Sequence, residues 1–204
     1  MSTRILLATR NRKKMAELQR ILDAALGSGA TTLVDLDDVD QYDEVPETGL
    51  TFRDNALLKA REGALRTGLP TVADDSGLEV DALNGMPGVF SARWAGRHGD
   101  DKANLDLVLG QISDVPDAAR GAAFVCAAAL VLPDGQEFTV DGRMTGRLIR
   151  QPRGDGGFGY DPIFVADGET RTNAELSPAE KDAISHRGQA FRALAEIIAR
   201  LFPH

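Results

Sequence analysis

The sequence predicts an α/β fold around a mixed β-sheet, for two reasons. Short apolar runs, which are typical of buried strands, alternate with segments whose apolar residues recur every three to four positions, which is typical of amphipathic helices. Such alternation favours helices packed against a sheet. The pair Asp134-Gly135 lies between two apolar runs and predicts a β-hairpin, so part of the sheet should be antiparallel.

The first expected elements are a strand, a helix and a second strand. Residues 4–8 form a short apolar run, and after a polar loop the apolar residues between 18 and 26 have helical spacing. Glycines within 27–29 should end this helix. A strand is then expected at 31–34, before a loop at 35–47 that is rich in acidic residues.

A second helix is expected between Thr51 and Gly68. Asp54 follows Thr51 at the spacing of a helix cap, and a glycine followed closely by a proline is typical of a helix end. The apolar run at 70–73 then leads into an Asp-Asp-Ser-Gly segment at 74–77. We therefore expect a buried strand that ends in an acidic turn.

A third helix and the hairpin come next along the chain. Apolar spacing predicts the helix at 105–112, and the hairpin pairs residues 124–132 with residues 137–140. A glycine-dense loop at 153–161 precedes a short strand at 163–165.

The chain is expected to end in a helical segment. Ser177, a proline and Glu180 form a helix-capping sequence. Apolar residues between 191 and 201 have the spacing of a terminal amphipathic helix.

Composition limits the possible partners. The chain has 204 residues, of which 43% are hydrophobic and 26% charged, and this is typical of one globular domain over residues 1–204. A formal charge of −8 would repel a nucleic acid polymer, although a small anion could bind in a local basic pocket. The longest apolar run, 122–132, is too short to cross a membrane. The single cysteine, Cys126, lies in that run, so we expect a buried thiol in the reducing cytoplasm.

A basic loop between the first strand and the first helix is a candidate phosphate site. It consists of Thr9, Arg10, Asn11, Arg12, Lys13 and Lys14. Backbone N–H groups at a helix start, the helix dipole and the lysines could together hold phosphates. The spacing is not that of a Walker loop, so a solvated basic first turn is the alternative interpretation.

The carboxylates of Glu47, Asp74 and Asp75 are candidate ligands for Mg²⁺. Oxygen ligands suit this hard ion, which keeps several waters and is completed by substrate phosphates, so few protein carboxylates are needed. The alternative is an ordinary acidic turn whose carboxylates face solvent.

Two later segments could recognise a nucleobase. Phe158, in the glycine-dense loop, could stack on the base, and Asp161 could accept a hydrogen bond from a ring N–H. Phe158 and Tyr160 could instead anchor the loop in the core. The second segment offers hydrogen-bond donors near a helix start, although a single histidine there is more often a surface residue. These donors are Lys181, Ser185, His186 and Arg187.

The ordered motifs match a known family. They are Thr9-x-Asn11-x-x-Lys14, Glu47-Thr-Gly-Leu-Thr-Phe52 with Asn55 and Lys59, Asp74-Asp75-Ser76-Gly77-Leu78, Pro87-Gly88 with Ser91-Ala-Arg93, Gly156-Gly-Phe-Gly-Tyr-Asp-Pro-Ile-Phe164, and Ala174-Glu-Leu-Ser177 with Lys181 and Ser185-His-Arg-Gly-Gln-Ala190. Over nearly its whole length the chain resembles the Ham1-like inosine/xanthosine triphosphate pyrophosphatases. Arg10 is a departure, because the family usually has glycine there.

The resemblance implies a two-lobed single α/β domain around a long mixed sheet, with an active-site cleft between the lobes. It also implies a cytoplasmic homodimer that depends on Mg²⁺. Asp75 falls at the catalytic position, and Glu47, Asp74 and Asp75 fall at metal-binding positions. The substrate-binding positions implied are the loop from Thr9 to Lys14, together with Lys59, Ser76, Phe158, Gly159, Tyr160, Asp161, Lys181, His186 and Arg187.

The implied reaction is hydrolysis of non-standard purine nucleoside triphosphates (ITP, dITP and XTP) to the monophosphate and pyrophosphate. Asp75 would orient or deprotonate a water that attacks the α-phosphorus, while Lys14 and Lys59 neutralise the leaving group. Two alternatives stay open at this point. One is a nucleotide-sensing protein without turnover, against which the three carboxylates argue, and the other is a phosphotransferase, which would need an acceptor.

Overall fold

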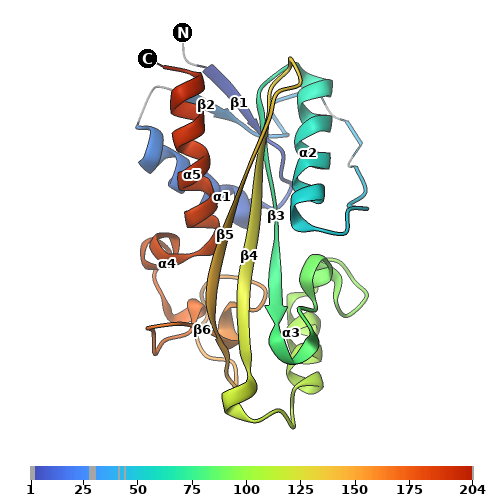
Figure 1. Cartoon of the computed structure of the whole chain (residues 1–204), viewed down its shortest axis with the longest axis vertical. Helices are drawn as coiled ribbons and strands as arrows, with labels where there is room; N and C mark the ends of the chain where they lie inside the picture. The colour runs from blue at the N-terminus through green and yellow to red at the C-terminus, as the bar shows by residue number, and fades with distance from the viewer. Residues whose placement is uncertain (1–2, 28–30, 41, 44, 204) are drawn as a thin grey trace. The chain divides into compact units, whose positions relative to one another are not determined.

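The computed structural model describes residues 3–27, 31–40, 42–43 and 45–203, apart from the side chains of Arg12, Lys13 and Leu26. Six strands form one sheet in the order β2-β1-β3-β4-β5-β6 (Figure 1). The elements β1 (Thr3–Leu7), β2 (Thr31–Val34) and β3 (Thr71–Val80) are parallel, whereas β5 (Glu137–Leu148) and β6 (Phe164–Ala166) are antiparallel. The sixth strand, β4 (Gly121–Val131), lies between β3 and β5. The predicted α/β class with a mixed sheet is confirmed.

The chain divides into two compact units, and each is described by itself. Unit 1 comprises Met1–Asp75, Cys126–Gly142 and Arg187–His204, and unit 2 comprises Ser76–Val125 and Arg143–His186. The helices of unit 1 are α1 (Arg12–Leu26), α2 (Phe52–Thr67) and nearly all of α5 (His186–Leu201). Those of unit 2 are α3 (Asp101–Gln111) and α4 (Pro178–Ile184). The expected cleft between two lobes stays a prediction.

The helix boundaries follow the capping residues that the sequence indicates. The hydroxyl of Thr51 accepts from the backbone N of Asp54 at 3.1 Å, and α2 ends at Gly68, whose φ of +66° is in the left-handed region that favours glycine. Ser177 and Glu180 form a complete capping box at the start of α4. The expected helix starts and ends are therefore confirmed at these positions.

Unit 1 buries both faces of its strands. Ile5 and Leu7 belong to one core cluster with apolar residues of α1 and α5. Leu6 points the other way, toward α2, because successive side chains of a strand alternate between faces. A Cβ placed on Gly63 of α2 would lie 3.1 Å from Cδ2 of Leu6 and 2.6 Å from Cγ2 of Thr71. The glycine thus lets α2 approach the sheet closely.

Unit 2 has its own core, in which α3 packs against strands. Leu78 of β3, Val108 of α3 and Phe164 of β6 are among its fully buried residues. The glycine-dense loop leads through a short helical turn, Asp161–Ile163, into β6, so this core anchors the end of the loop. The buried Cys126 belongs to the core of unit 1 instead, as a free thiol, which confirms its expected burial.

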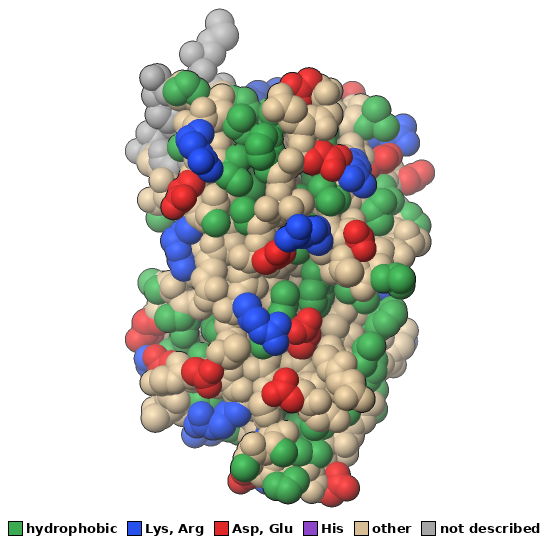
Figure 2. Space-filling view, in the orientation of Figure 1, with side chains coloured by type: hydrophobic (Ala, Val, Ile, Leu, Met, Phe, Trp, Pro, Cys, Tyr) green, Lys and Arg blue, Asp and Glu red, His purple; other side chains and the backbone are tan. Residues whose placement is uncertain are grey.

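The charged surface is mixed. On the face drawn in Figure 2, Lys and Arg side chains are interspersed with Asp and Glu side chains. Among the described residues, no helix is long and apolar enough to cross a membrane.

The expected acidic turn at 74–77 is wrong, because these residues lie in the middle of β3. The strand continues through them since it is paired in the centre of the sheet, and this context overrides the turn preference of Asp, Ser and Gly. Gly77 permits the close approach of another segment, because a Cβ there would lie 2.5 Å from the carbonyl oxygen of Gly88. The two acidic residues are buried, not exposed at a strand end.

Candidate active site

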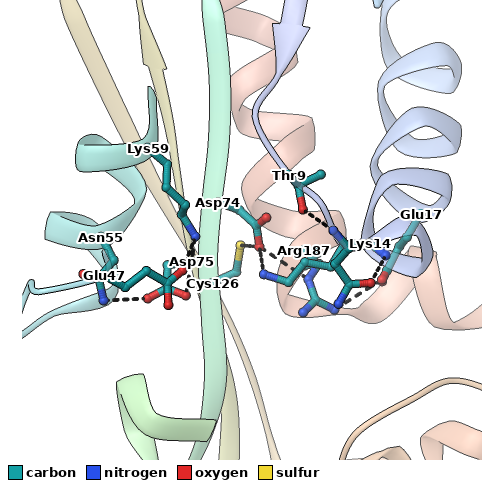
Figure 3. A network of polar contacts seen from close by, with 11 residues as sticks. Thr9, Lys14, Glu17, Glu47, Asn55, Lys59, Asp74, Asp75, Cys126 and Arg187 are labelled. Carbon is teal, nitrogen blue, oxygen red and sulfur yellow. Dashed lines mark hydrogen bonds and ion pairs between the residues drawn. The ribbon is translucent and has the colours of Figure 1, made fainter. Parts of the chain in front are cut away.

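Asp75 and Asp74 point to opposite sides of β3, as Figure 3 shows and as neighbouring residues in a strand must. Both residues are buried, with exposed fractions of only 6% for Asp75 and 2% for Asp74. They therefore belong to two different polar groups in unit 1, one for each face of the strand.

The group around Asp75 is built by α2 and the loop before it. Nδ2 of Asn55 donates to Oδ2 of Asp75 at 3.0 Å, and Nζ of Lys59 lies 3.9 Å from Oδ1. Asn55 and Lys59 are four residues apart, so they share one face of α2. The helix thus presents an amide and an ammonium group to the same carboxylate.

Lys59 also donates to Oε1 of Glu47 at 2.8 Å. One lysine therefore lies against two carboxylates. Burial would lower the pKa of Lys59, but the charges of Asp75, Asp74 and Glu47 outweigh burial and raise it. Lys59 stays an ammonium ion under physiological conditions.

The environment raises the pKa of Asp75. Burial is the largest cause, and the charge of Glu47 adds to it, while Lys59, Lys14 and the Asn55 hydrogen bond act in the opposite direction. A carboxylate with a raised pKa is a stronger proton acceptor than an exposed one. This suits the role that the family resemblance implies for Asp75.

On the other side of β3, Asp74 pairs with cations from α1 and α5. Nζ of Lys14 donates to its Oδ2 at 3.0 Å, and Nε of Arg187 lies 3.6 Å from the same oxygen. Burial alone would raise the pKa of Asp74, but Lys14 and Arg187 hold it well below its usual range. Arg187 also donates to Oε2 of Glu17 at 3.2 Å, so these four side chains form one buried network (Figure 3).

The basic loop ends in a capped helix start. Oδ1 of Asn11 accepts from the backbone N of Lys14 at 3.1 Å, and the hydroxyl of Thr9 accepts from the N of Asn11 at 3.3 Å. Asn11 therefore accepts from a free N–H at the start of α1, as a helix-capping residue does. Arg12 and Lys13 occupy the first turn of α1, and their side chains lie outside the described residues.

Arg10 fits the loop without strain. Its backbone is not among those with positive φ, so a side chain is tolerated where the family usually has glycine. Its Nη2 donates to the carbonyl oxygen of Tyr42 at 2.8 Å. Arg10 thus ties the basic loop to the segment that precedes Glu47.

The predicted metal ligands do not form a single cluster of three carboxylates. Within the described ranges, no group of three or more His, Cys, Asp or Glu residues is placed to hold a metal ion. Glu47 and Asp75 share Lys59, whereas Asp74 faces Lys14 and Arg187. Two carboxylates fit Mg²⁺ nonetheless, because this ion commonly takes one or two from protein and the rest of its ligands from phosphate and water. The single lysine leaves the pair with a net negative charge that a cation would balance.

Unit 2 holds the residues predicted to recognise a base. Asp161 accepts from Nζ of Lys181 at 2.8 Å and from the backbone N of Phe158 at 2.9 Å. The Nζ of Lys181 also lies 4.9 Å from the ring centroid of Phe158, which is a cation–π distance. Three of the predicted residues are thereby brought together.

Neighbouring residues of the loop have structural partners. Tyr160 is buried and its hydroxyl donates to the carbonyl oxygen of Ser91 at 2.8 Å, so it anchors the loop in the core. The N of Gly159 donates to Oδ2 of Asp101 at 3.0 Å. Ser76, another predicted substrate residue of unit 2, is half-buried in β3.

The donors of the second segment have different partners. Lys181 contacts Asp161, the buried His186 stacks on Phe124 with ring centroids 4.9 Å apart, and Arg187 joins the network of unit 1. Their shared role in recognising a base stays a prediction.

Asn55, which contacts Asp75, and Glu17, which contacts Arg187, are not among the predicted site residues. Asn55 could have been found from its position four residues before Lys59 on the same helix face. Glu17 could have been found as an acidic residue next to Leu18 on the buried side of α1, where an unpaired charge would be costly.

The chain is similar to known proteins over nearly its whole length. The model of the Ham1 family matches residues 5–197. A dITP/XTP pyrophosphatase of Nocardia farcinica is 62% identical over 198 residues, which are 97% of this chain and 96% of that protein. The crystal structure of the nucleoside-triphosphatase, or dITP/XTP pyrophosphatase, of Mycobacterium abscessus is 59% identical, with a TM-score of 0.76 and coverage of 99% and 100%. A HAM1 protein of Coxiella burnetii is 41% identical, with a TM-score of 0.85 and coverage of 97% and 99%.

Proposed function

Because this chain belongs to the Ham1 family, we propose that it hydrolyses non-standard purine nucleoside triphosphates, such as dITP, XTP and ITP, to the monophosphate and pyrophosphate. One observation carries the proposal. Asp75 is a buried carboxylate held by Asn55 and Lys59 beside Glu47, and Lys14 of the basic loop lies in the same unit. This combination of carboxylates and lysines suits the cleavage of a phosphoanhydride.

The chemical step needs a water and a proton acceptor. We propose that Asp75 accepts a proton as the water oxygen attacks the α-phosphorus. The new bond joins water oxygen to phosphorus, and the bond between the α-phosphorus and the bridging oxygen breaks, so that pyrophosphate leaves. Asn55 holds the Asp75 carboxylate in one orientation through its 3.0 Å hydrogen bond, so the acceptor is preorganised.

The lysines and the basic loop would bind the triphosphate. Negative charge builds on the leaving pyrophosphate, and the ammonium groups of Lys14 and Lys59 would stabilise it. The positive end of the α1 dipole and the loop from Thr9 to Lys14 favour an anion at the same helix start. We propose that Asp74, which lies on the same side of β3 as Lys14, holds Lys14 in place.

Mg²⁺ would be held by Glu47 and Asp75, and when bound it would neutralise phosphate charge and make the phosphorus more electrophilic. The two carboxylates, with Lys59 between them, are the donor set that fits this ion.

Base selection would depend on three residues of unit 2, Phe158, Lys181 and His186, and on Arg187 of unit 1. We propose that Phe158 stacks on the purine and that donors from Lys181, His186 and Arg187 recognise the oxo groups of hypoxanthine and xanthine. Adenine presents an amino donor at the 6-position, which would leave buried donors unpaired. Asp161 already accepts from Lys181 and Phe158, so we propose that it positions these groups instead of contacting the base.

The proposed function includes expectations for the oligomeric state, the location in the cell and the partners. We propose a homodimer in the cytoplasm that acts on small molecules and has neither a nucleic acid polymer nor a membrane as partner. The net charge of −8 and the interspersed charges in Figure 2 support a small anionic substrate over a polyanion. Light scattering of the purified chain tests the dimer.

A panel of triphosphates tests the function. The protein would be incubated with Mg²⁺ and ITP, XTP, dITP, ATP or GTP, and pyrophosphate and orthophosphate would be measured separately. We expect pyrophosphate only, with kcat/KM for ITP exceeding that for ATP by roughly 10⁴-fold or more. Equal values for ITP and ATP would contradict the base selection, and absence of hydrolysis without an acceptor would contradict the hydrolase.

A further inference from the structure

Asp161 is the central residue of a buried hydrogen-bond network in unit 2. Its Oδ2 accepts from Nζ of Lys181 and from the backbone N of Phe158, and its Oδ1 accepts from Nδ2 of Asn173 at 3.2 Å. Asp161, Asn173 and Lys181 are exposed by only 2%, 1% and 7%. The orientation of one carboxylate is thus determined by three donors.

Two of these donors belong to residues that the proposed function places against the base. The third donor, Asn173, binds the other oxygen of the carboxylate, Oδ1. If Asn173 were removed, Oδ1 of Asp161 would stay buried without this donor, and the carboxylate could rotate about its terminal bond. Lys181 and the backbone N of Phe158 would then no longer have a hydrogen-bond acceptor that is fixed in one orientation.

A short helical turn, Asn173–Glu175, places Asn173 against the glycine-dense loop. The hydroxyl of Thr172 donates to the carbonyl oxygen of Arg153 at 2.8 Å, and the N of Gly156 donates to the carbonyl oxygen of Ala174 at 3.0 Å. Thr172 and Glu175 cap the turn with a complete capping box. The turn and the loop are therefore fastened together on both sides of Asn173.

The side-chain amide of Asn173 has only one chemically reasonable orientation. A carboxylate oxygen accepts hydrogen bonds, so the NH₂ group must face Asp161 and Oδ1 of Asn173 must face away. Within the described part of the chain this Oδ1 is buried and has no hydrogen-bond partner. Leucine would fill a similar volume without burying an unpaired acceptor. An asparagine at this position therefore loses stability in exchange for its hydrogen bond to Asp161.

We propose that Asn173 is a positioning residue for base selection, which acts through Asp161 on Lys181 and Phe158. This inference rests on the proposed function, because it takes Lys181 and Phe158 as the groups that meet the base.

The test compares the wild-type chain with Asn173→Leu, using ITP and ATP. For Asn173→Leu we expect kcat/KM for ITP to fall about 10-fold, mainly through a higher KM, while the value for ATP changes less than about twofold. Arg171→Ala is the matched control, since Arg171 is exposed, lies two residues away and pairs with Glu169 and Glu180. This control should keep the wild-type ratio.

A double-mutant cycle with Lys181→Met separates positioning from a structural role. If Asn173 acts through Asp161 on Lys181, its replacement should have little further effect on the ITP/ATP ratio once Lys181 is gone. Fully additive effects would overturn the inference. If Asn173→Leu does not fold, as judged by its thermal unfolding, Asn173→Ala supplies the same comparison.

The remaining outcomes are distinct. An unchanged ITP/ATP ratio in a folded Asn173 variant, with both activities lowered equally, would overturn the positioning role and leave the proposed function intact. A wild-type chain that does not prefer ITP to ATP would overturn the proposed function itself.

Discussion

Asn55 connects the start of α2 to Asp75 through a single side chain. Its Nδ2 donates to Oδ2 of Asp75 at 3.0 Å, and its Oδ1 accepts from the backbone N of Gly49 at 2.8 Å. Both hydrogen-bonding ends of the amide are thus used, and Asn55 is fully buried. The loop that carries Glu47 and the strand that carries Asp75 are thereby held by the same residue.

Replacement of Asp75 by asparagine should abolish most activity without unfolding the chain. Asparagine has the same shape but cannot accept a proton, so we expect kcat to fall about 10³-fold. Lys59 keeps Glu47 as a partner, which limits the loss of stability. Steady-state turnover and thermal unfolding are the measurements. The matched control is Asp106→Asn, whose parent side chain is exposed and pairs with Lys102. Wild-type turnover in folded Asp75→Asn would rule out Asp75 as the proton acceptor.

Glu47→Gln should weaken Mg²⁺ dependence more than it weakens the chemical step. The glutamine removes one negative charge from the pair around Lys59, so the Mg²⁺ concentration for half-maximal activity should rise roughly 10-fold. Excess Mg²⁺ should then restore part of the activity, whereas Asp75→Asn should not recover. Glu62→Gln on α2, which removes the charge that pairs with Arg66, is the control. Activity independent of Mg²⁺ in both variants and in the wild type would disprove the metal assignment.

Lys14→Met should destabilise the chain as well as slow it. The change removes the closest cation of the buried Asp74 and leaves Arg187 at a longer distance, so we expect a loss of about 3 kcal/mol in the free energy of unfolding. Adding Asp74→Asn to this variant should recover part of the stability but none of the activity, since the phosphate ligand is still absent. Urea denaturation and turnover measure both effects. If the double variant were less stable than Lys14→Met, the pairing would not have the role given to it here.

Two glycines of the base loop offer a matched comparison. Gly157 and Gly159 have φ of +69° and +60°, so alanine strains the backbone at either position by about 1 kcal/mol. Only at Gly157 would the new Cβ also meet Asp161, at 2.3 Å from Oδ2, whereas nothing lies within 4 Å at Gly159. We expect Gly157→Ala to raise KM for ITP several-fold more than Gly159→Ala does. Equal KM values would mean that Asp161 does not organise the loop.

The sequence allowed the order of elements to be predicted because local signals are strong there. Thr51, Gly68 and the Ser177 capping box mark helix ends through contacts within a few residues. At residues 74–77 the same local reasoning predicted a turn, and this prediction is wrong because the segment lies within β3. Its residues favour turns in isolation, but pairing in the centre of the sheet gives them an extended backbone. Because successive side chains of a strand point to opposite faces, Asp74 and Asp75 then lie on different sides of β3.

Partners that lie far apart in the sequence could not be predicted from local sequence patterns. Arg187 pairs with Glu17, which is 170 positions away in the sequence, and no local spacing indicates such a contact. The role proposed for Asn173 could not be predicted from the sequence either, because it depends on the packing of a short turn against the glycine-dense loop. The residue types of the candidate site could be predicted, but the assignment of each charge to a partner required the fold.

The position of bond cleavage is the most direct test of the account. Hydrolysis of ITP in water labelled with ¹⁸O, in the presence of Mg²⁺, should place one labelled oxygen in inosine monophosphate and leave the released pyrophosphate unlabelled, since Asp75 is proposed to direct water at the α-phosphorus. Label in orthophosphate or in pyrophosphate would mean attack at another phosphorus and would contradict the account.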